Sequence, residues 1–167
     1  MRKLPFALAV ASLAGFAGGA GAAQLSAQDQ QFVEQAARAG LEEVQSGQLA
    51  EQKGGSQAIK QLGQTLVSDH TMMNEQLKQI AQKQGFTLPQ SLDQEDRQEM
   101  QQLRNASGQQ FDSRFADEQI EDHTKMIQVL QKEAQTTQDS DLRTFAEGGI
   151  PVMQKHLQMA QQAKTAG

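Results

Sequence analysis

The chain has 167 residues, with 15 basic and 20 acidic side chains and a formal net charge of -5. This acidic balance argues against nucleic acid as a partner, because binding phosphates requires a basic face. The absence of cysteine, tryptophan and tyrosine excludes disulfides and thiolate nucleophiles, and it removes the usual aromatic platforms for stacking bases or sugars.

Residues 1–23 have the pattern of a secretory signal peptide. Its three parts are a basic start, an apolar stretch and small residues for cleavage, at Arg2–Lys3, Leu4–Phe16 and Ala20–Ala23. A membrane anchor is the alternative, but the apolar stretch is short for a span. We therefore expect a periplasmic or otherwise exported protein whose mature domain covers residues 24–167 and has no stable membrane span. Cleavage would take the formal charge from -5 to -7.

Four long helices and one short helix are predicted in the mature chain. Ser26 and Asp29 resemble a capping box at the first helix start. Gly54 and Gly55 end that helix, and Pro89 prevents the segment after the second helix from being helical throughout. The predicted helices cover residues 27–52, 57–84, 93–105, 110–136 and 141–164.

Each long helix carries an apolar seam in which residues alternate by three and four positions. This spacing is typical of helices packed in a bundle. The clearest example is Ile59, Gly63, Leu66, His70, Met73, Leu77 and Ile80. We therefore predict an all-α fold, a four-helix bundle with a long connection between the second and third long helices that carries the short helix.

The three histidines, His70, His123 and His156, lie on the seams of three different long helices, and Glu43 lies on the seam of the fourth. At a rise of ~1.5 Å per residue, each lies roughly 20–24 Å along its helix. All four side chains are therefore expected at mid-height of the bundle, whichever way the helices run. Polar groups aimed at one interior cost stability unless they bind a ligand or satisfy each other.

Imidazole nitrogen and carboxylate oxygen are ligands for zinc, copper, iron or manganese. The sequence thus indicates one transition-metal ion held by Glu43, His70, His123 and His156, with Asp69 and Asp122 flanking the site rather than joining it. A hydrogen-bonded core network without metal is the alternative. Methionines three residues after each histidine, Met73, Met126 and Met159, would suit copper, or they fill the core.

Several short motifs together resemble an exported bacterial family, the domain of unknown function 4142, which is regarded as ferritin-like. The motifs are Gly40–Val44, Ser68–Thr71, Gly108–Asp112, Glu121–His123 and Pro151–Leu157. The resemblance implies a ferritin-like four-helix fold and an envelope location, and it implies no activity.

Di-iron bundles carry Glu-x-x-His motifs on two helices. In this sequence the residues three positions before the histidines are Val67, Ile120 and Met153. A second iron would lack bridging carboxylates, which favours a single ion or no metal over oxidative iron storage.

Two functions therefore remain from the sequence. The first is an exported bundle that binds a metal for metal handling or envelope stress. The second is a metal-free structural or interaction protein in the periplasm that meets a partner through its glutamine-rich surface and crossover helix. A hydrolase is not supported, because no Ser-His-Asp spacing or phosphate-binding glycine loop occurs. No catalytic residue, substrate or protein partner is identified.

Overall fold

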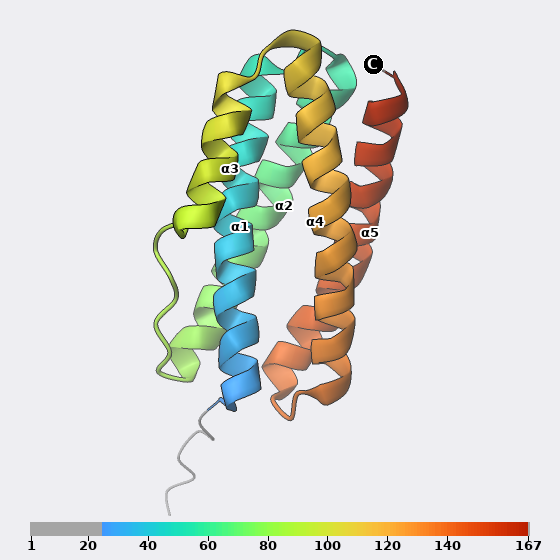
Figure 1. Cartoon of the computed structure of the whole chain (residues 1–167). Coiled ribbons are helices and arrows are strands. Elements are labelled where there is room, and N and C mark those ends of the chain that lie inside the picture. Colours follow the sequence, from blue (N-terminus) through green and yellow to red (C-terminus); the bar gives the residue numbers. More distant parts are fainter. Residues whose placement is uncertain (1–24, 167) are drawn as a thin grey trace, which may run out of the picture.

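A computed structural model describes residues 25–166 as an all-helical bundle (Figure 1). The predicted signal peptide lies outside these residues. The helices are α1 (Ala27–Lys53), α2 (Gln57–Lys83), α3 (Gln94–Asn105), α4 (Gly108–Thr136) and α5 (Ser140–Ala166). All five predicted helices are confirmed, each end within two residues of its predicted position. No helix in the described part of the chain is long and apolar enough to cross a membrane.

Short-range hydrogen bonds decide where the helices begin. Ser26 and Asp29 form the expected reciprocal capping box at α1, and Asp93 and Asp96 form another at α3. The hydroxyl of Ser56 accepts a hydrogen bond from the first turn of α2. These caps satisfy backbone N–H groups that have no partner inside a helix.

The four long helices pack side by side, with α1 and α5 each contacting both α2 and α4. Figure 1 shows α2 and α4 running in the same direction, because the loop after α2 and the short helix α3 carry the chain back before α4 begins. α3 packs against α1 and α4. This order places α2, α4 and α5 so that the middle of each faces a common interior.

The apolar core is divided into two clusters. One, called here the lower core, contains Phe32, Val33, Ala37, Leu77, Ile80, Ala81, Leu130, Leu142, Phe145, Ala146 and Met153 together with Leu25. The other, the upper core, contains Ala50, Ile59, Leu62, Leu66, Leu103, Ala106, Phe111, Phe115, Ala116, Ala160 and Ala163.

On every long helix a polar residue lies between the residues of these two cores. These residues are Glu43 in α1, His70 in α2, His123 in α4 and His156 in α5. The fold therefore buries a polar layer between two apolar ends, at the height that the sequence predicts.

Candidate metal centre

The three imidazoles converge inside the bundle. Their ring centroids lie 5.8 Å apart for His70 and His123, 5.4 Å for His70 and His156, and 5.1 Å for His123 and His156. The exposed fractions of these residues are 6%, 1% and 0% for His70, His123 and His156. Each ring offers one nitrogen, and these three nitrogens lie within 4.8 Å of one another. Such a group is close enough to share one metal ion.

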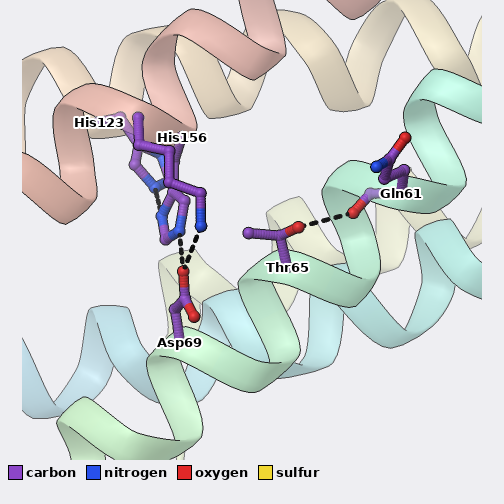
Figure 2. Close-up of polar contacts among 6 residues, drawn as sticks. Gln61, Thr65, Asp69, His123 and His156 are labelled. Atoms are coloured by element: carbon purple, nitrogen blue, oxygen red, sulfur yellow. Dashed lines mark hydrogen bonds and ion pairs between the residues drawn. The ribbon is translucent and has the colours of Figure 1, made fainter.

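Two of the rings are held at their outer nitrogens. The Nδ1 of His123 lies 3.0 Å from the carbonyl oxygen of Gln119. The Nε2 of His156 lies 3.0 Å from Oδ2 of Asp69, and Figure 2 shows the chain of contacts from His123 through His156 to Asp69. A carbonyl or carboxylate oxygen only accepts hydrogen bonds, so each of these outer nitrogens carries the proton.

The inner nitrogens of the same two rings then carry lone pairs. Nε2 of His123 and Nδ1 of His156 are 3.1 Å apart. In two neutral rings with protonated outer nitrogens, these inner atoms are both acceptors, and neither has a proton to donate to the other. The Nε2 of His70 is also buried and has no hydrogen-bond partner among the described residues. The three rings therefore bring buried nitrogens together with no proton to share between His123 and His156.

Burial keeps the rings neutral. Burial, together with the charge of the neighbouring imidazoles, lowers the pKa of His70 and of His123 to about 3. Burial also lowers the pKa of His156, although the hydrogen bond to Asp69 opposes this. Neutral imidazole is the form that binds a metal, so the three rings are ready to do so near neutral pH.

Asp69, predicted beside the site, lies at its edge between α2 and α5. Its Oδ2 accepts a hydrogen bond from His156 and a second, at 3.2 Å, from Nζ of Lys155. Burial alone would raise the pKa of Asp69, but these hydrogen bonds lower it. The carboxylate is therefore ionised and a strong acceptor for the imidazole N–H.

Glu43 is brought to the site from the outer side of His123. Its Oε1 lies 3.6 Å from Nδ1 of His123, the nitrogen that also faces Gln119. Its Oε2 is buried without a hydrogen-bond partner among the described residues. Burial, together with the charges of Asp122 and Glu42, raises its pKa well above the usual value.

Among the described residues, the group of ligand atoms that all lie within 4.8 Å of one another consists of one nitrogen from each histidine. Glu43 is not part of this group. Its role as a fourth ligand therefore stays a prediction.

A cavity of about 50 Å³ adjoins the site. Asp122, also predicted to flank the site, lines it together with Glu43, His70 and His123. Burial, opposed by the charge of Lys125 and reinforced by nearby carboxylates, raises the pKa of Asp122 to about 6. Asp122 thus faces the same interior space as two of the histidines.

The methionines that follow the histidines are divided between two places. Met73 and Met126 line the cavity, and Met153 joins them there. Met159 packs against the upper core instead. The pattern of a methionine three residues after each histidine therefore describes the site for two helices only.

Two contacts of the site escaped the sequence reasoning. The first is the backbone carbonyl of Gln119, which no side-chain pattern reveals. It lies one helical turn before His123, where a backbone acceptor is to be expected. Lys155, which binds Asp69 from the neighbouring helix, could be found only once α2 and α5 were known to be adjacent.

Comparison with known proteins matches one family. Its model, described as a domain of unknown function (DUF4142), covers residues 14–163. No curated protein and no solved structure matches the chain.

Proposed function

The chain belongs to this family of unknown function, and we propose that it is an exported metal-binding bundle in which His70, His123 and His156 hold one transition-metal ion. The observation that carries the proposal is the direction of the ring nitrogens. Gln119 and Asp69 hold the outer N–H groups of two rings, which leaves the inner lone pairs facing each other. Histidines that bind metals almost always donate their other N–H to such acceptors.

A hydrogen-bonded network without metal accounts less well for these contacts. A buried network stabilises a fold only if its members are satisfied. Here Nε2 of His70 and Oε2 of Glu43 are buried without partners among the described residues, and two imidazole acceptors lie 3.1 Å apart. A cation bound by the three inner nitrogens would satisfy the imidazoles together.

The donor set favours a single ion of zinc, copper, iron or manganese, because neutral imidazoles suit these metals. Valine, isoleucine and methionine occupy the positions where a di-iron bundle would carry its glutamates, at Val67, Ile120 and Met153. A ferritin-like four-helix fold is supported by the crossover between α2 and α4. Export is supported by the sequence pattern of residues 1–23. The physiological role we propose is metal handling or protection of the envelope under stress.

The test is metal binding by the purified protein after chelator treatment. We expect one zinc or copper ion per chain and a melting temperature raised by several degrees. A ligand present at a hundredfold excess over its Kd adds about 2.7 kcal/mol to the free energy of unfolding. Each kcal/mol raises the melting temperature by ~2–4 °C in a domain of this size.

Two variants locate the ion. His123→Ala should abolish the rise in melting temperature, whereas Leu62→Ala, which empties a comparable volume in the upper core, should keep it. Equal shifts in both variants would place the metal elsewhere. No shift in the unaltered protein would favour the metal-free structural or interaction bundle.

A further inference from the structure

The cavity beside the histidines is lined by residues of all four long helices. Its polar lining consists mainly of Glu43 from α1, His70 from α2, and Asp122 and His123 from α4. Its volume of about 50 Å³ exceeds the ~10–15 Å³ that a single water needs. The space therefore suits a ligand of a few heavy atoms.

Two of the residues that line this cavity have polar atoms without partners. Oε2 of Glu43 and Nε2 of His70 are buried and make no hydrogen bond within the described residues. Glu43 is 7% exposed and His70 is 6% exposed. Buried polar atoms without partners are rare in folded proteins, and each calls for a ligand or another explanation.

The protein supplies three imidazoles, which leaves a tetrahedral ion one position short. Structural zinc sites are closed by four protein ligands, whereas catalytic sites have three and leave the fourth position open. Glu43 contacts the outer nitrogen of His123, at 3.6 Å, and not the inner nitrogen that would face the ion. Its second oxygen is thus free to contact a molecule bound beside the ion.

We propose that the ion held by the three histidines keeps one open coordination position toward this cavity, and that a small inorganic ligand of one to three heavy atoms binds there and contacts the carboxyl group of Glu43. Water, hydroxide, peroxide and azide belong to this class. The inference rests on the metal site proposed above. It makes the centre a reactive or sensing site, because a purely structural site would exclude exogenous ligands.

Apolar side chains complete the lining of the cavity. They include Met126, Leu130, Phe145 and Met153, and apolar side chains offer no hydrogen bonds to a larger polar ligand. Ala36 is also part of the lining. A larger side chain at position 36 would therefore reduce the cavity from α1, which contributes none of the three imidazoles.

The experiment uses the full protein loaded with Cu²⁺ and titrated with azide. We expect a charge-transfer absorption band that saturates at one azide per copper. Imidazole, with five heavy atoms, should produce no change, because it does not fit the cavity. Copper bound at one ion per chain without an azide band would overturn the open position while leaving the metal site intact. If no copper binds, the metal site itself fails, and the open position fails with it.

Three variants test the cavity itself. Ala36→Leu should fill the cavity and weaken azide binding at least tenfold without changing the copper content. Glu43→Met removes the carboxyl group at similar length and should weaken azide binding to the copper-loaded protein at least tenfold. The control is Ala58→Leu, because Ala58 is a partly buried alanine packed on the upper core, as Ala36 is on the lower core. Azide affinity that is unchanged in both test variants would overturn the proposal.

Discussion

Asp69 and His156 are 87 positions apart in the chain, yet Oδ2 of one lies 3.0 Å from Nε2 of the other. This contact joins α2 to α5 and decides which nitrogen of His156 faces His123. The ionised carboxylate also makes the imidazole a better electron donor at its other nitrogen. The orientation of the proposed ligand set thus depends on a residue that is not itself one of the three histidines.

Removing this acceptor should weaken metal binding. Asp69→Ala is expected to lower the affinity for zinc or copper by about 10- to 100-fold, with one ion per chain retained, as found for partners of metal-binding histidines. Competition with a chelator of known affinity measures the change. Lys155→Ala is the control, because its exposed ion pair with Asp69 is worth at most about 1 kcal/mol, or roughly fivefold. An unchanged affinity in Asp69→Ala would show that the carboxylate does not orient the ring.

The close approach of α1 and α2 should make Gly63 intolerant of a side chain. A Cβ at Gly63 would lie 2.6 Å from the carbonyl oxygen of Gly47 and 2.8 Å from Cβ of Ala50. Gly63→Ala should therefore lower the free energy of unfolding by about 1–3 kcal/mol through overpacking. Gly148 is also helical, and a Cβ there meets nothing within 4 Å. Gly148→Ala should raise the free energy of unfolding by up to about 1 kcal/mol. Urea denaturation that gives both variants the same sign would contradict this.

Asp112 should stabilise the turn between α1 and α2. Its carboxylate accepts hydrogen bonds from the backbone N–H groups of Gly55 and Ser56, both at 2.8 Å. Asp112→Ala should cost about 1–3 kcal/mol, because hydrogen bonds to charged groups are worth more than neutral ones. Asp117→Ala, on the same helix, removes only an exposed pair with Lys164 and should cost less than about 1 kcal/mol. Equal denaturant midpoints for the two variants would show that the hydrogen bonds of Asp112 do not stabilise the turn.

Stability should depend on pH through Glu133, which lies beside Asp29 where α4 meets α1. Burial, followed by the hydrogen bond and charge of Asp29, raises the pKa of Glu133 to about 7 from 4.5. The folded state therefore holds a proton that the unfolded state has lost between these pH values. The stabilising contribution is complete below pH 4.5 and is lost as the pH rises through 7.

Glu133→Gln removes this proton equilibrium. Between pH 5 and pH 8, the free energy of unfolding of the variant should rise by about 1–2 kcal/mol relative to that of the unaltered protein. This range follows from ~1.4 kcal/mol per pKa unit, reduced because solvent partly screens the group. Urea midpoints of both proteins across this range measure the difference. A constant difference would mean that Glu133 titrates normally.

The helices and the height of the polar layer could be predicted because both depend on short-range patterns. Caps such as Ser26 with Asp29 act within one turn, and a regular rise per residue puts His70 and His123 at comparable heights in any bundle of these helices. The periodic seams likewise place the three histidines inside, since apolar faces pack together. Their convergence required only that the helices be neighbours.

What the sequence could not decide is the direction of each ring. The partner of His156 lies on another helix, at Asp69, and the carboxyl group of Glu43 reaches the outer nitrogen of His123. Such contacts depend on helix rotation and rotamers within a few ångströms, which spacing along the chain does not specify. The same holds for Met159, which lies in the upper core although its spacing matches Met73. The sequence alone thus determined that the three histidines meet inside the bundle, and the packing of the helices decided which atoms face one another.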